Sequence, residues 1–261
     1  MKKLNVKPVK DLPVVDGKYI IQNSNDAFLI DNECSVVIEP NIIATIIDNS
    51  KNSEIEILVS QNSTLNYLVT DSIDCRRHFN VNGKLNYTQI ALIETKENLC
   101  VDLEVENAEA LIKTLCIASS YCSYLKQNVN HNAKQTLSNV NNVAVAFNKG
   151  DINFDITGKI SKTMSKSRCQ QLTRGIIMDN DSSVCAKPIL LIDEYDCFAN
   201  HGAAIGKMSD DDLFYLMSRG LNKNEAFLLI LQGIIKPFID SLEDDEMKER
   251  IDNEISKMIE K

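Results

Sequence analysis

Eight cysteines and three histidines are the side chains of this 261-residue chain best suited to metal binding or nucleophilic chemistry. The cysteines are Cys34, Cys75, Cys100, Cys116, Cys122, Cys169, Cys185 and Cys197. No two of them have C-x-x-C spacing, which argues against a zinc ribbon or a thioredoxin-type site. Taken singly, each cysteine is expected to be a small buried apolar side chain, because free cysteine is among the most buried residue types.

The sequence offers no site for nucleotide hydrolysis. It contains no G-x-x-x-x-G-K-[ST] motif, and its 9 glycines leave little material for a loop that cradles phosphate. Any ATP hydrolysis coupled to this chain must therefore belong to a partner.

The elements that position the cysteines and histidines are expected to be short strands between Val14 and Ile205. The clearest run alternates Leu99, Val101, Leu103 and Val105 with polar neighbours, a period of two that buries one face. Clusters of Asn, Ser and Asp separate the runs, as at residues 23–26 and 61–64, and such clusters are typical of turns. A sandwich, a barrel and a β-helix all fit this pattern.

The pattern changes to helix after Gly206. Ser209 is a suitable N-cap for a first helix that Gly220 ends, and Asn222 with Glu225 resembles a capping box for a second. Pro237 is expected to kink or end that second helix. A third, charged helix is predicted from the spacing of its apolar residues Met247, Ile251, Ile255 and Met258. The predicted division is a β domain over residues 1–206 and a helical domain over residues 207–261.

Bulk properties narrow the class of protein. The net charge of -9 disfavours a partner bound through phosphate neutralisation, so no nucleic acid or anionic membrane is expected. No apolar run approaches the roughly 20 residues of a membrane span, and the N-terminus lacks the apolar part of a signal peptide. The chain is therefore expected to be cytoplasmic, with its cysteines present as thiols.

Two segments resemble a known family. Residues 200–208 read NHGAAIGKM and residues 212–221 read DLFYLMSRGL, which is similar to the C-terminal signature of the SufBD family. Upstream, His131 with Thr136 and Ser138, then Phe147, Gly158 and Lys159, follow the family's order. The resemblance covers about residues 131–236. Residues 1–130 resemble the family only in their general pattern of short strands and polar turns. The N-terminal helical region of longer members is expected to be missing.

The resemblance implies a right-handed parallel β-helix followed by a small helical domain, which selects one of the three β architectures. It also implies a non-catalytic scaffold for iron–sulfur cluster assembly. Members of the family pair through their last β-helix coils, with a SufB-type subunit or a second copy. They bind an ABC-type ATPase, SufC, through the C-terminal helices, and a transient cluster at the subunit interface is the expected cofactor.

The branch of the family is read from positions near the signature histidine. Thr173 stands where the SufB branch has a cysteine, with Cys169 four positions away, and Gly202 stands where SufB has glutamate. Both differences favour SufD. Where SufD proteins tend to have a cysteine, two residues before the histidine, this chain has Ala199.

The site residues follow from the resemblance. His201 and Cys197 are the candidate ligands for iron or sulfur at the subunit seam. The competing interpretations are a hydrogen-bonded structural histidine and a buried thiol. The candidate partner-binding residues of the first helix are Asp210, Asp211, Asp212, Phe214, Tyr215 and Arg219. The two aromatic side chains are also expected to pack this helix on the end of the β-helix.

The other histidines are expected to have structural roles. His131 is expected to make a turn-stabilising hydrogen bond. His78, beside Arg76 and Arg77, is expected on the solvated surface.

Two other functions remain open from the sequence. A SufB-type homodimer would hold the nascent cluster itself. A β-helix enzyme acting on polysaccharide would need a pair of carboxylates and aromatic platforms for sugars. The chain has 6% aromatic residues and no tryptophan, which disfavours the enzyme.

Overall fold

The computed structural model describes residues 5–240 and 245–259. Over these residues the chain forms two nine-stranded sheets, here called sheet A and sheet B, followed by three α-helices. Sheet A contains, in pairing order, β1 (Val6–Pro8), β4 (Ala27–Ile30), β6 (Ile43–Asp48), β8 (Thr64–Thr70), β10 (Lys84–Ala91), β12 (Glu109–Ser119), β14 (Leu137–Phe147), β16 (Arg168–Ile177) and β18 (Phe198–Lys207).

Sheet B contains the strands that alternate with these along the chain. They are β2 (Val14–Val15), β3 (Lys18–Ile21), β5 (Cys34–Ile38), β7 (Glu54–Val59), β9 (Cys75–Val81), β11 (Lys96–Leu103), β13 (Cys122–His131), β15 (Asp151–Ile160) and β17 (Ser183–Ile192). A short 3-10 helix, Val9–Asp11, joins β1 to β2.

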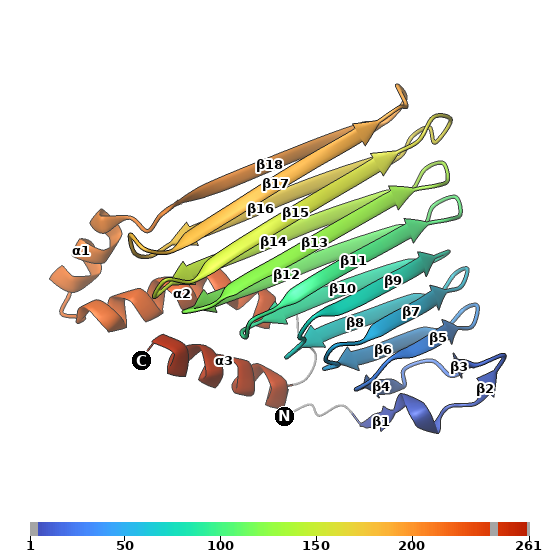
Figure 1. Ribbon diagram of the computed structural model, residues 1–261, viewed down its shortest axis with the longest axis horizontal. Helices are drawn as coiled ribbons and strands as arrows, with labels where there is room; N and C mark the ends of the chain where they lie inside the picture. Colours follow the sequence, from blue (N-terminus) through green and yellow to red (C-terminus); the bar gives the residue numbers. More distant parts are fainter. Residues whose placement is uncertain (1–4, 241–244, 260–261) are drawn as a thin grey trace.

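From β3 onward, successive strands fall in opposite sheets, and each strand pairs in parallel with the strand two before or after it. The chain therefore winds as a parallel β-helix with its coils stacked from β2 at one end to β18 at the other (Figure 1). The antiparallel pair β2–β3 closes the first end. The mainly β, β-helix prediction is confirmed.

The interior follows from the two-residue period. Ile55, Ile57 and Val59 of β7 are buried, whereas Glu54 and Glu56 between them are exposed. In-register parallel pairing stacks the buried residues of successive coils into one apolar core. The corners use the expected chemistry: Asn25 and Asn62 adopt φ of 66° and 59°, a left-handed conformation that asparagine tolerates better than most residues.

The interior also contains a buried charged side chain. Arg77 is 1% exposed and lies inside the β-helix. Its Nε donates to Asp48 Oδ2 at 2.7 Å, and its Nη1 donates to Glu97. The hydroxyl of Tyr67 also donates to Asp48, so the buried charges are paired and hydrogen-bonded together.

The three helices are α1 (Asp210–Ser218), α2 (Lys223–Ile239) and α3 (Asp245–Ile259). The predicted caps are confirmed: Ser209 accepts from Asp212 N, Asn222 and Glu225 form a capping box, and Gly220 follows α1 with φ of 100°. Pro237 lies inside α2, which continues to Ile239, so the proline does not end the helix at its own position, and a kink there stays a prediction.

Helices α2 and α3 pack on the outer face of sheet A. Leu231 and Ile235 of α2 and Ile251 and Ile255 of α3 form a second apolar core with outward-facing residues of sheet A. The side chain of Met247, predicted on the same face, lies outside the described part. The helices therefore cover a flank of the β-helix, whereas packing on its end was expected for α1. No helix in the described segments is long and apolar enough to cross a membrane.

Strands end at Lys207 and helices begin at Asp210, close to the predicted boundary at residue 206. The division into two domains stays a prediction, because α2 and α3 share a core with sheet A.

Candidate functional site

The last coil of the β-helix, β17 and β18, is open at its free edge. Each of these strands pairs on one side only, β17 with β15 and β18 with β16. Three large apolar side chains are exposed on the outer face of this last coil: Ile189 at 42%, Leu191 at 51% and Phe198 at 51%. The apolar strand at residues 188–192 was expected to be uncovered, and within the described residues it is.

His201 lies in this open coil and faces the interior of the β-helix. It is paired in register with Gln171 of β16, so both side chains point to the same side of sheet A. Gln171 is 3% exposed, which identifies that side as the inside, whereas His201 is exposed because no further coil covers it. Within the described residues the His201 ring makes no hydrogen bond, so the structure does not support a histidine held by internal hydrogen bonds.

Two buried oxygens lie in the coil beneath His201. Gln171 Oε1 and Thr173 Oγ1 have no hydrogen-bond partner among the described residues, although Gln171 Nε2 contacts Ile189 O at 3.4 Å. A buried oxygen without a hydrogen-bond partner lowers the stability of the fold by about 1–3 kcal/mol. These two oxygens can therefore accept a hydrogen bond from a donor or contact a cation. The sequence did not reveal them, because both faces of β16 carry polar residues.

Gly158 makes room for this arrangement. A Cβ at this position would lie 2.4 Å from Cys169 Sγ and 2.8 Å from Gln171 Nε2. Glycine is therefore required on β15 for the facing strand β16 to place these two side chains inside. Gly158 is part of the sequence pattern that resembles the SufBD family, and the close approach of these β16 side chains is the physical reason for a glycine at this position.

Two thiols accompany the histidine. Cys169 is buried, and its pKa is raised by burial and further by the neighbouring Cys197, while a hydrogen bond from Ser138 opposes the rise. Cys197 lies just before β18 and is half-buried, with Sγ donating to Glu194 O at 3.1 Å. Burial and the carboxylates of Glu194 and Asp196 raise its pKa. Both groups are thus protonated thiols near neutral pH.

His201 and Cys197 do not make a complete metal site within one chain. They are four residues apart, roughly 13 Å along an extended strand. The described residues bring together three metal-binding side chains at one place only, on sheet B, and neither His201 nor Cys197 belongs to it. A cluster held at the open coil would need ligands from a second chain.

The candidate partner-binding residues all lie on α1 or at its end. No residue of α1 is buried. Phe214 is 75% exposed and Tyr215 57%, so the expectation that they pack α1 on the β-helix is wrong. Arg219 stacks on Tyr215, with its guanidinium carbon 5.2 Å from the ring centre. Asp210, Asp211 and Asp212 are exposed in the first turn, where the helix dipole favours acids.

The remaining cysteines and histidines divide between core and surface. None of the eight cysteines forms a disulfide, and Cys75, Cys116 and Cys169 are buried as expected, whereas Cys122 is exposed. Burial raises the pKa of Cys116 to about 12. His131 is buried, with Nδ1 2.7 Å from Thr136 Oγ1 and Nε2 2.8 Å from Ser138 Oγ, which confirms its structural hydrogen bonding.

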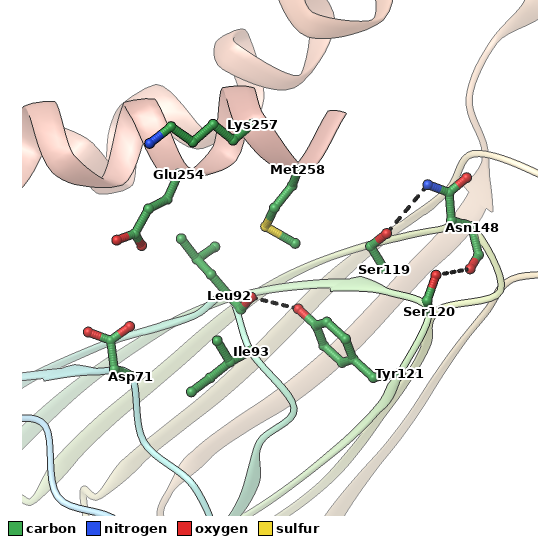
Figure 2. Close-up of a pocket in the computed structure, with 10 residues that line it drawn as sticks. All are labelled: Asp71, Leu92, Ile93, Ser119, Ser120, Tyr121, Asn148, Glu254, Lys257 and Met258. Atoms are coloured by element: carbon green, nitrogen blue, oxygen red, sulfur yellow. Dashed lines mark hydrogen bonds between the residues drawn. The ribbon is translucent and has the colours of Figure 1, made fainter. Parts of the chain in front are cut away.

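A cleft of about 550 Å³ lies between α3 and the corners of the β-helix (Figure 2). Glu254 and Met258 of α3 face Leu92 and Tyr121 across it. Its lining contains no histidine or cysteine, and the Tyr121 hydroxyl is engaged by backbone carbonyls. Sequence reasoning missed this cleft, because it exists only where α3 packs beside the corners.

The fold and the open coil define a class: a parallel β-helix with a terminal helical segment and a histidine facing inward at its open end. The family model described as "SUF system FeS cluster assembly, SufBD core domain" matches residues 20–234. The chain belongs to the SufBD family.

Several curated relatives match part of the chain. The iron–sulfur cluster assembly protein SufD of Bacillus subtilis (strain 168) is 35% identical over 106 residues, 41% of this chain and 24% of the relative. SufD of Escherichia coli (strain K12) is 25% identical over 158 residues, 60% of this chain and 37% of the relative. A SufBD family protein of Mycobacterium bovis is 31% identical over 112 residues, 43% of this chain. The matched part thus spans well under half of each of the two SufD relatives, and the chain is SufD-like.

Proposed function

We propose that this chain is a SufD-like scaffold subunit of an iron–sulfur cluster assembly complex. It pairs through β17 and β18 and takes part in cluster assembly through His201. The observation that carries the proposal is the inward-facing, unbonded His201 above the unpaired oxygens of Gln171 and Thr173, in an open coil of a SufBD family member. The cluster is cargo here, and the chain itself performs no catalysis.

The choice of a SufD-like role over a SufB-type homodimer rests on ligands. Thr173 occupies the interior position where the SufB branch has a cysteine, and threonine supplies no thiolate. Cys169 is buried, and Cys197 is four residues from His201, too far along an extended strand to share one ion with it. A partner chain that brings a thiolate across the open coil would complete a site with the His201 imidazole.

The test is cluster accumulation by the His201→Ala variant. The chain is reconstituted anaerobically with the ATPase and the SufB-type subunit, and bound iron and sulfide are measured beside the free energy of unfolding. Loss of a ligand should lower bound iron and sulfide at least about tenfold. Because the His201 ring is exposed, the free energy of unfolding should change by no more than about 0.5 kcal/mol.

Wild-type cluster content in His201→Ala would contradict the role of this histidine. Cys197→Ser, measured beside it, tells whether the nearby thiol shares that role. A third sample omits the SufB-type subunit, and full cluster content in that sample would favour the homodimeric scaffold instead.

We also propose that α1 is the docking surface for an ABC-type ATPase. It exposes Phe214, Tyr215 and three successive acids, and none of its residues is buried. An exposed aromatic pair beside charged residues is typical of a protein–protein contact. Because α2 and α3 cover sheet A, deleting the whole helical segment would damage the fold, and point variants are the cleaner probe.

Co-purification with the ATPase tests the docking surface. Phe214→Ser and an Asp210→Asn, Asp211→Asn, Asp212→Asn triple variant should each reduce the retained ATPase at least about tenfold, because truncating a central contact costs about 2 kcal/mol or more. Glu249→Gln, on the exposed side of α3, is the control and should retain it. Unchanged retention by both α1 variants would show that the ATPase docks elsewhere.

A further inference from the structure

Three different metal-binding side chains converge on the outer face of sheet B. They are His78 of β9 and Cys100 and Asp102 of β11, and their ligand atoms all lie within 4.8 Å of one another. His78 Nε2 is 2.7 Å from Asp102 Oδ2. The strand register explains the convergence. Cys100 is paired directly with His78, and Asp102 follows two residues later on the same face.

A fourth side chain orients this group. Asn130 of β13 is paired with Asp102 and donates from Nδ2 to Asp102 Oδ1 at 2.7 Å. The same Nδ2 lies 3.8 Å from Cys100 Sγ. One carboxylate oxygen is thus held by the amide, which leaves Oδ2 directed at the imidazole. Such outer contacts fix the orientation of ligands in metal sites.

The group is accessible from solvent. The side chain of His78 is 41% exposed and that of Asp102 is 18% exposed. Helices α2 and α3 cover the other sheet, so within the described residues no helix closes this face. An ion can therefore enter directly, and the exposed imidazole can turn to meet it.

We propose that His78, Cys100 and Asp102 bind one first-row divalent cation of the zinc type, with a fourth position left to water. A tetrahedral ion with bonds of 2.0–2.3 Å needs ligand atoms about 3.4–3.6 Å apart, so the three side chains need only small rotamer shifts. A sulfur, a nitrogen and a single carboxylate suit Zn²⁺, Co²⁺ or Fe²⁺ and do not suit Mg²⁺ or Ca²⁺, which require more oxygens.

The charges balance at this site. On binding, the Cys100 thiol loses its proton to solvent, and the thiolate and the Asp102 carboxylate together neutralise the doubly charged ion. The imidazole binds as a neutral ligand through the nitrogen that now faces Asp102, and its remaining proton moves to the other ring nitrogen. No oxidation or reduction is involved.

This site is independent of the proposed assembly function. Strand β11 is separated from β17 by β13 and β15, roughly 14 Å across the sheet, and the site faces outward. His201 faces inward in sheet A. Loss of the outer site should therefore leave cluster accumulation at His201 testable on its own.

The test is titration of the untagged, reduced 261-residue chain with Co²⁺ alone, after treatment with a chelator and under anaerobic conditions. One equivalent of Co²⁺ should produce thiolate-to-cobalt charge-transfer absorption in the near-ultraviolet, and Zn²⁺ should displace it. Cys100→Ser and His78→Gln should each abolish this absorption. Asn130→Ala should weaken Co²⁺ binding about tenfold, as expected for an orienting contact.

Cys122→Ser is the matched control. Cys122 is also exposed, and its Sγ lies 3.5 Å from an Asp151 oxygen, but no histidine belongs to that pair. This variant should keep the full signal. Absence of the signal from the wild-type protein, its persistence in Cys100→Ser and His78→Gln, or its equal loss in Cys122→Ser would each overturn the proposal. Should Cys100→Ser fail to fold, His78→Gln decides alone, because it alters a partly exposed side chain.

Discussion

Arg77 shows how one residue can constrain the interior of a β-helix. Its guanidinium is enclosed between Asp48 and Glu97, and all three side chains are 0% exposed. The Tyr87 hydroxyl donates a hydrogen bond to Glu97 Oε1 at 3.1 Å, so the carboxylate that pairs with Arg77 is itself held in place. A buried ion pair of this kind adds little net stability, but losing one partner leaves an uncompensated charge.

The first prediction follows from that asymmetry. Arg77→Ala should lower the free energy of unfolding by about 3–5 kcal/mol, because two carboxylates then remain buried without a cation. Denaturant unfolding at neutral pH measures the loss. Arg76→Ala, one residue earlier and exposed, is the control and should change the free energy by no more than about 0.5 kcal/mol. Equal, small effects of the two changes would show that the buried pair carries no such penalty.

His131 gives a prediction about pH. Burial lowers the pKa of His131 from 6.5 to about 4, so the folded protein keeps this imidazole neutral. Below pH 6.5 the unfolded chain binds a proton that the folded chain refuses. Stability is therefore fully present above that pH and falls as the pH drops towards 4, by about 3 kcal/mol in total.

The measurement compares the wild type with His131→Gln across pH 4 to 7. The variant loses the titrating group, so its unfolding free energy should fall less steeply over this range, whatever its stability at neutral pH. Parallel curves for the two proteins would contradict the assignment of this acid sensitivity to His131.

At the scale of elements, the C-terminal helices act as a cover for sheet A. Outward-facing residues of β12 and β14, such as Leu115, Ile117 and Val145, are fully buried although they lie on the outside of the β-helix. They owe that burial to α2 and α3. Helix α2 is accordingly rich in apolar residues, as expected of a helix that packs on a sheet.

Two aliphatic residues of α2, one buried and one exposed, test this role. Ile235→Ala should lower the free energy of unfolding by about 2–5 kcal/mol, because the side chain is 1% exposed and its removal leaves a cavity between α2 and sheet A. Leu229→Ala is the control: this side chain is 49% exposed, so the change should cost much less. Thermal and denaturant unfolding check both. A larger effect at Leu229 than at Ile235 would contradict the packing of α2 on sheet A.

At the scale of the whole molecule, the two ends of the β-helix differ. The first end carries the short antiparallel pair β2–β3, whereas the last coil presents β17 and β18 with unpaired edges. Open edges of long strands with exposed apolar residues tend to find a partner. The geometry thus favours association at the last coil.

We expect the isolated chain to form dimers at micromolar concentration through β17 and β18. Leu191→Lys should weaken the dimer at least about tenfold, because it places a charge among exposed apolar residues of the pairing edge. Val14→Lys, the same kind of change at a 56% exposed residue of the opposite end, should leave the dimer intact. Light scattering over a dilution series measures the dimer dissociation of the wild type and of both variants. A monomeric wild type, or equal weakening by both variants, would contradict pairing at the last coil.

The sequence by itself determined the local structure. Alternation such as Leu99, Val101 and Leu103 can bury only one face of a strand, and asparagine corners and helix caps act within a few residues. The resemblance at residues 200–221 then selected the β-helix and the family, and it pointed to His201 before any geometry was known.

Only the tertiary structure decided which residues meet. Arg77 lies between Asp48 and Glu97 because β6 of sheet A faces β9 across the interior and β11 pairs with β9 in parallel register, and no local pattern carries that information. The same register brings His78 to Cys100, and it places Gln171 beneath His201. The tertiary structure likewise leaves Phe214 exposed and places α2 and α3 on the flank of sheet A. Apolar periodicity indicates that one face of an element must be buried, but only the folded chain determines the surface against which that face packs.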